Sequence, residues 1–131
     1  MLFVYHFEDH PQFGPGATRL LQAAEHDQLQ LVTSVLTLME VLVVPKREKQ
    51  IQLCHRYREL FASFPRLTVL PIDPPIAEVA SDLRATYTLR TPDALHLATA
   101  IVAGAHAFVT EDRRLSNISA LRVIGIEQAV H

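Results

Sequence analysis

The chain has 131 residues, of which 49% are apolar, and its 12 Lys and Arg against 14 Asp and Glu give a formal net charge of -2. This length and composition suit one compact domain that buries its own core, so we expect a single domain over residues 1–131. The charge argues against a protein that holds nucleic acid mainly through a broad basic surface. It does not exclude an enzyme that holds phosphate through metal ions, because cations bound to carboxylates reverse the local field.

The single cysteine, Cys54, cannot form an intramolecular disulfide and has no second cysteine with which to share a zinc ion. This pattern fits a reducing cytosol. The N-terminus reaches His6, Glu8 and Asp9 before any apolar run of secretory length, and no stretch approaches the ~18 to 20 apolar residues of a transmembrane helix. We therefore expect a soluble, cytoplasmic protein without a membrane partner.

Short apolar runs alternate with longer segments of helical periodicity, which predicts an α/β fold with a mainly parallel sheet. Residues 2–5 and 29–32 have the composition of strands, and a helix is expected between them after a turn rich in Pro and Gly. Ser34 can cap the next helix, and Pro45 is expected to end it. An amphipathic helix over residues 47–64 completes a predicted helical hairpin.

The second half of the chain continues the alternation of strands and helices. A third strand is predicted over residues 67–70, and residues 73–75 then start a helix. Another helix starts at residues 91–93, where a proline suits the first helical turn because its missing N–H is harmless there. Strands are expected at residues 107–109 and 121–124, on either side of a polar loop. These runs together predict a sheet of four to five strands.

Three carboxylates stand out because each lies where an apolar element meets a strand end or a helix start: Glu40, Asp93 and Asp112. Glu40 lies inside the apolar run 36–44, where an unpaired charge would cost several kcal/mol without a metal ion or a partner. Asp93 lies at the start of a helix, where the helix macrodipole by itself stabilises a carboxylate. Asp112 follows a strand, where aspartate commonly forms turns. Considered singly, these two aspartates are better explained by capping and by turn formation.

Three segments resemble, in order, the three later motifs of PIN domains, a family that includes the toxin half of bacterial VapBC toxin–antitoxin modules. The segments are TSVLTLME at residues 33–40, TPDALHLATA at residues 91–100 and FVTEDRRL at residues 108–115. The resemblance extends over nearly the whole chain, and the middle motif is the most specific. It implies a three-layer α/β/α sandwich whose central parallel sheet brings acidic residues together at its carboxyl edge.

The resemblance also implies a Mg²⁺- or Mn²⁺-dependent ribonuclease that hydrolyses RNA phosphodiester bonds. Its catalytic carboxylates would be Glu40, Asp93 and Asp112, which would ligate the metal directly or through water, the two aspartates being the expected direct ligands. These hard cations prefer oxygen ligands and keep several waters, one of which can be the nucleophile. Thr110 and Ser34 could orient water or a carboxylate, although local capping explains both hydroxyls equally well.

Other polar residues of the same motifs have less specific interpretations. Three arginines are candidates for contact with RNA phosphates: Arg90, Arg113 and Arg114. Most surface arginines, however, simply keep the protein surface solvated. His96 could share a metal ion with the aspartate three residues before it, but hydrogen bonding at a packed helix is the favoured role. Glu111 is expected to point away from the neighbouring aspartate into solvent.

The N-terminal motif of the family is incomplete in this sequence. PIN domains normally begin with a strand that ends in an aspartate, and residues 1–9 resemble the segment just after that aspartate. Glu8 and Asp9 are poor substitutes, because they follow the apolar run and are expected to be solvated. Either the first strand is incomplete because the natural start lies upstream, or the chain has lost one ligand and binds metal weakly.

The leading hypothesis is therefore an endoribonuclease toxin that acts on RNA. The family resemblance also suggests a homodimer and a cognate antitoxin that covers the acidic cleft and inserts a basic side chain. The alternative is a PIN-like binding or regulatory module with impaired catalysis. A phospho-receiver domain shares the α/β class, but it needs paired acids after the first strand and a lysine after the last, and the only lysines are Lys46 and Lys49.

Overall fold

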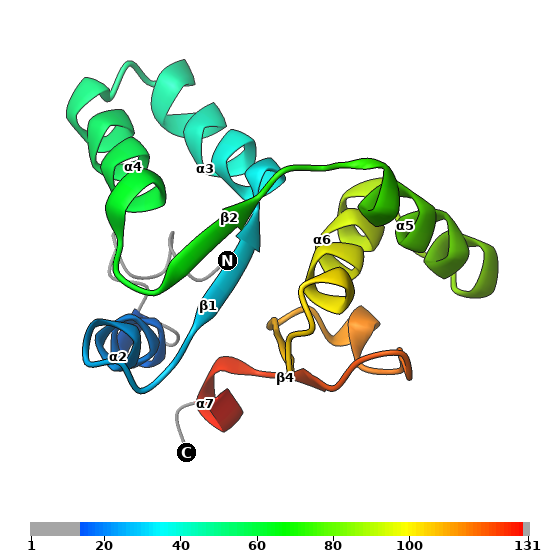
Figure 1. Ribbon diagram of the computed structural model, residues 1–131. Coiled ribbons are helices and arrows are strands. Elements are labelled where there is room, and N and C mark those ends of the chain that lie inside the picture. The colour runs from blue at the N-terminus through cyan, green and yellow to red at the C-terminus, as the bar shows by residue number, and fades with distance from the viewer. Residues whose placement is uncertain (1–13, 130–131) are drawn as a thin grey trace.

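The computed structural model describes residues 14–129, in which helices alternate with short strands (Figure 1). Within these residues, no helix has both the length and the apolar character needed to cross a bilayer. The predicted strand at residues 2–5 lies outside the described residues, as do Glu8 and Asp9. The elements in chain order are α2 (Gly14–Glu25), β1 (Leu31–Ser34), α3 (Val35–Arg47), α4 (Ile51–Ser63), β2 (Leu67–Leu70), α5 (Pro74–Thr86), α6 (Thr91–Val102), β3 (Phe108–Val109), the 3-10 helix η1 (Arg113–Leu115), β4 (Val123–Ile124) and α7 (Ile126–Ala129).

The described strands pair in parallel, as the sequence predicts. β1 pairs with β2 from Leu31 opposite Leu67 to Ser34 opposite Leu70, and β3 pairs with β4. Among the described residues the strands form two separate pairs rather than one sheet of four to five strands. The sequence could not specify this, because pairing depends on partners that are distant along the chain.

The sequence predicts the first of these strands two residues too early, at residues 29–32 instead of Leu31–Ser34. The ladder to β2 includes the polar residues Thr33 and Ser34, which the apolar pattern assigns to the cap of the next helix. The side chain of Ser34 nevertheless performs that capping role, because its Oγ accepts a hydrogen bond from the Leu36 backbone N–H at 3.1 Å. One residue thus ends the strand and starts the helix.

Pro45 does not end α3, contrary to the sequence prediction, because the helix continues to Arg47. A proline removes a single backbone hydrogen bond, and this loss is tolerable in the last turns of a helix where the ring is buried. Lys46 and Arg47 follow in the last turn, where positive charge interacts favourably with the helix dipole. Packing and charge together extend the helix beyond the proline.

Helices lie on both sides of the β1–β2 pair, with α3 and α4 on one side and α5 and α6 on the other (Figure 1). The apolar core accordingly has two clusters. The first joins α2, α3 and α4 to the strands through side chains that include Leu21, Val41, Tyr57 and Phe61. The second packs α5 and α6 against η1 and the β3–β4 pair. This arrangement confirms the predicted α/β class with helices covering parallel strands.

Replacement of Leu97 by Ala should test the second cluster, because Leu97 is fully buried in α6. We expect the free energy of unfolding to fall by about 2 to 5 kcal/mol, as buried contacts are lost and a cavity opens. Val102→Ala is the control on the same helix, since Val102 is 42% exposed, and it should cost less than about 1 kcal/mol. Urea denaturation measures both changes, and equal losses would contradict this description of the core.

Candidate active site

The start of α6 positions Asp93. Arg90 precedes the helix in an extended conformation, and a proline follows in the first turn, where no backbone N–H is needed. Arg84 of α5 fastens this loop, because its Nη1 donates to Thr91 Oγ1 at 3.0 Å and its Nε donates to the Leu89 carbonyl at 3.1 Å. The Asp93 side chain is only 18% exposed and lies 3.3 Å from Arg90 Nε. The Asp93 carboxylate is therefore largely buried, and the loop before it is fixed by hydrogen bonds from Arg84.

The loop after β3 positions Asp112. The Asp112 backbone N–H donates to Thr110 Oγ1 at 3.0 Å, and Asp112 Oδ1 accepts from the Arg114 backbone N–H at 3.0 Å, which caps η1. The Arg114 Nε also donates to both Asp112 carboxylate oxygens, at 2.9 and 3.1 Å. The side-chain hydrogen bond from Arg114 lowers the pKa of Asp112 from 3.8 to about 2. Asp112 is therefore ionised at any physiological pH.

Arg114 brings the two aspartates together. Its Nη2 bonds to Asp112 Oδ2 and lies 3.9 Å from Asp93 Oδ2, so both carboxylates face one guanidinium. Asp93 and Asp112 come from different elements and are 19 residues apart in the sequence. Two of the three carboxylates that the sequence singled out thus share one cation.

The third carboxylate, Glu40, reaches the same helix by another contact. Its Oε1 lies 2.7 Å from His96 Nε2, and both side chains are half-buried. His96 lies one turn after Asp93 on α6, so Glu40 of α3 contacts the helix that holds the first aspartate. The hydrogen-bonding role favoured for His96 is confirmed, and it supplies the partner that Glu40 needs within its apolar run.

The prediction that Glu111 is solvated is wrong. Its side chain is half-buried, and Oε1 accepts a hydrogen bond from the Ile126 backbone N–H at the start of α7. The contact of Thr110 Oγ1 with the Asp112 backbone turns the chain there, so the alternation of β3 does not continue into this loop. Glu111 consequently connects the loop that carries Asp112 to the C-terminal part of the described chain.

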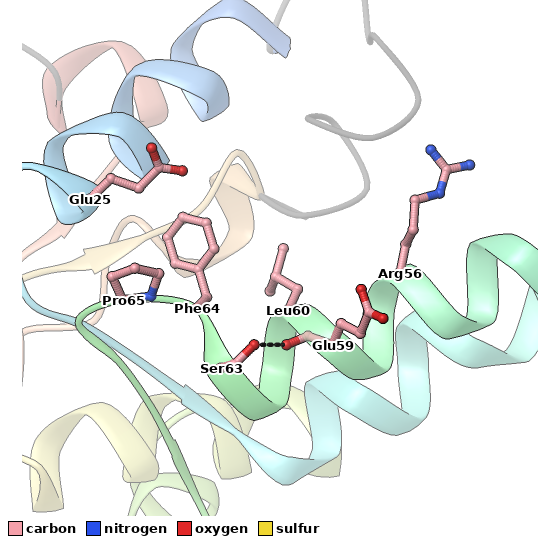
Figure 2. A pocket seen from close by; sticks show the side chains of 7 residues that line it. All are labelled: Glu25, Arg56, Glu59, Leu60, Ser63, Phe64 and Pro65. Atoms are coloured by element: carbon pink, nitrogen blue, oxygen red, sulfur yellow. Dashed lines mark hydrogen bonds between the residues drawn. The ribbon is translucent and has the colours of Figure 1, made fainter.

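A hollow of about 340 Å³ lies elsewhere, between the end of α2 and α4 (Figure 2). Leu60, Phe64 and Pro65 contribute apolar lining, and Ser63 Oγ is already engaged with the Glu59 carbonyl at 2.8 Å. None of the candidate carboxylates lines this hollow. The acidic side chains around α6, rather than the hollow, therefore define the candidate site.

Comparison with known proteins identifies the family of this chain. The family model of the PIN domain matches residues 2–121. The chain belongs to the PIN domain family. Its fold is similar to that of a solved chain described as a toxin–antitoxin complex from Klebsiella pneumoniae, with a TM-score of 0.69 and 27% sequence identity over 92% of this chain and 89% of that one. The comparison with curated proteins gives no match.

The three candidate carboxylates of this PIN domain do not all lie close enough together to ligate one metal ion directly. Within residues 14–129, no three Asp, Glu, His or Cys side chains are close enough to hold one metal ion. The pair Asp93 and Asp112 does fit a hard divalent cation, because Mg²⁺ is commonly held by one or two carboxylates while it keeps several waters. The guanidinium of Arg114 stands in for such a cation at both carboxylates. A divalent ion at this pair is therefore chemically reasonable.

Arg114→Gln in this PIN domain should raise the pKa of Asp112 from about 2 toward 3.8, because the largest cause of the lowered value is the Arg114 side-chain hydrogen bond. A lowered carboxyl pKa stabilises the folded state above pH 4, and that stabilisation disappears as the pH falls toward 2. NMR titration of the carboxyl carbon measures the change directly. Arg113→Gln is the control and should leave the Asp112 pKa unchanged; an unchanged value in Arg114→Gln would contradict the assignment.

Proposed function

We propose that this PIN domain is a Mg²⁺- or Mn²⁺-dependent endoribonuclease and the toxin of a toxin–antitoxin pair. PIN domains are generally nucleases, which supports the reaction class. The similar chain from a toxin–antitoxin complex supports the biological role. The observation that carries the proposal is the approach of Asp93 and Asp112 to one guanidinium, because it places two carboxylates where a single cation contacts both.

The proposed reaction is hydrolysis of an RNA phosphodiester by water. A bound Mg²⁺ or Mn²⁺ supplies Lewis-acid activation of the scissile phosphate and of the attacking water. Asp93 and Asp112 hold the ion. Thr110 fixes the backbone of Asp112 through the 3.0 Å hydrogen bond to its N–H and so keeps that carboxylate in place.

Glu40 is proposed to ligate the metal through water. His96 holds the Glu40 carboxylate against α6 at 2.7 Å, one helical turn from Asp93. Such a contact fixes the orientation of a ligand and leaves its second oxygen for another partner. Ser34 caps α3, the helix that carries Glu40, so its hydroxyl positions this carboxylate through the helix rather than by contact.

RNA phosphates are proposed to contact the exposed arginines beside the carboxylates. Arg90 lies 3.3 Å from Asp93, and Arg113 is exposed on η1, next to Asp112 in the sequence. Guanidinium groups bind phosphate oxygens in a bidentate manner, so they can hold the backbone without reading the base sequence. These arginines put positive charge beside the carboxylates, which favours the approach of the RNA backbone.

Asp93→Asn should lower Mn²⁺-dependent RNA cleavage by about a hundredfold or more, because the neutral amide is a much weaker ligand for a hard cation. Asp82→Asn is the matched control on the exposed face of α5 and should retain full activity. Cleavage of a labelled RNA by the 131-residue chain, with and without Mn²⁺, gives the comparison. Undiminished cleavage by Asp93→Asn would exclude the proposed site.

The alternative is a PIN domain that binds RNA or a protein partner without cleaving. It is favoured by one observation within residues 14–129, namely that no three Asp, Glu, His or Cys side chains are close enough to hold one metal ion. The two functions separate when the chain is assayed with Mn²⁺ for both RNA binding and RNA cleavage. Cleavage supports the nuclease, whereas RNA binding without cleavage supports the alternative.

The partners of the proposed toxin are a cognate antitoxin and a second copy of the chain. An apolar stripe of Val35, Met39 and Val43, spaced four residues apart, follows one exposed face of α3. Exposed apolar stripes on soluble domains commonly mark interfaces. We assign this face to the homodimer, and the carboxylates to a basic side chain of the antitoxin.

Met39→Lys should disrupt the proposed homodimer, because Met39 is 54% exposed at the centre of the stripe and a buried lysine would lack a partner. Ile51→Lys is the control, since Ile51 is 66% exposed at the start of α4 and is not part of the stripe. Light scattering coupled to size-exclusion chromatography should give a dimer for the parent and for Ile51→Lys, and a monomer for Met39→Lys. A monomeric parent chain would rule out this interface.

A further inference from the structure

Arg114 occupies most of the hydrogen-bonding capacity of Asp112. A carboxylate offers about four lone-pair positions on its two oxygens. Asp112 Oδ1 accepts from the Arg114 backbone N–H at 3.0 Å and from Nε at 2.9 Å, and Oδ2 accepts from Nε at 3.1 Å and from Nη2. Because the single Nε hydrogen is shared between the two oxygens, three N–H groups of one residue cover both oxygens and leave little room for a divalent ion while the guanidinium stays.

The same guanidinium also approaches the second carboxylate of the candidate site. Its Nη2 lies 3.9 Å from Asp93 Oδ2, and Asp93 is otherwise contacted by Arg90 at 3.3 Å. A metal ion at these oxygens would be repelled by the guanidinium, because both carry positive charge. Binding of the ion and the Arg114 contact therefore compete with each other.

The Arg114 side chain can leave without unfolding the loop. It is 61% exposed, so its guanidinium can exchange the carboxylate for water. The backbone hydrogen bond from Arg114 to Asp112 Oδ1 caps η1, and the neighbouring Leu115 is buried in the second core cluster. These contacts hold the backbone in place while the side chain moves.

We propose that Arg114 is a built-in competitor of the divalent cation, so that a metal ion binds at Asp93 and Asp112 only as the guanidinium moves off Asp112. This inference rests on the proposed function, because it concerns the same two carboxylates. Without metal, Arg114 offsets part of the negative charge of the acidic pair, and its contacts lower the apparent affinity of the site for the ion. The sequence gives Arg114 no role distinct from that of Arg113, and only the contacts separate the two.

Calorimetric titration of the full chain with Mn²⁺ alone tests the proposal. Arg114→Gln should bind Mn²⁺ about tenfold more tightly than the parent, because a bidentate charged contact no longer has to be broken. Arg113→Gln is the matched control: it removes the same charge from the same 3-10 helix, but Arg113 takes no part in the ion pairs found among residues 14–129. It should bind Mn²⁺ within about twofold of the parent.

Arg114→Lys provides a second variant that keeps the charge but lacks the planar fork. It should bind Mn²⁺ more tightly than the parent and more weakly than Arg114→Gln. Equal or weaker binding by both Arg114 variants, with Mn²⁺ still bound by the parent, would overturn the competitor role and leave the metal site intact. The absence of Mn²⁺ binding in every form, including Arg114→Gln, would overturn the competitor role together with the proposed function.

Discussion

The candidate site depends on one electrostatic constraint, which is that carboxylates close together in a partly buried place need a cation. Asp93 and Asp112 satisfy it through the guanidinium of Arg114, and Asp93 has a further contact with Arg90. Glu40 has a different partner, the His96 imidazole, whose Nε2 lies 2.7 Å from Glu40 Oε1. Each acid therefore has a partner within the chain itself. A metal ion bound at this site would have to compete with these internal contacts.

The helix α6 (Thr91–Val102) makes this arrangement possible, because it carries both Asp93 and His96 one turn apart. Its other face is apolar and packs against α5 within the second core cluster, where Leu97 is fully buried. The core therefore fixes the rotation of the helix about its axis. That rotation sets the direction of both polar side chains. His96 faces Glu40 of α3, and Asp93 faces Arg114, which follows β3.

The sequence predicted much of this arrangement and failed where the chain makes contacts at long range. The helical periodicities identified α3, α4, α5 and α6, and the motif order selected Glu40, Asp93 and Asp112. No local pattern could pair Glu40 with His96, because 56 residues separate them. For the same reason the contact of Glu111 with Ile126 was missed. The pattern also left Arg113 and Arg114 indistinguishable, since only the path of the turn decides which arginine faces the acids.

In the proposed divalent cation site, Asp93 and Asp112 hold the ion and Arg114 must withdraw from them. The most direct measurement is a crystal structure of the protein grown with Mn²⁺ and analysed by anomalous scattering from manganese. We expect an anomalous peak within direct coordination distance of both aspartates, with the Arg114 guanidinium turned away from Asp112. Crystals that show Arg114 still bound to Asp112, with manganese absent from the pair or bound elsewhere, would rule out this site.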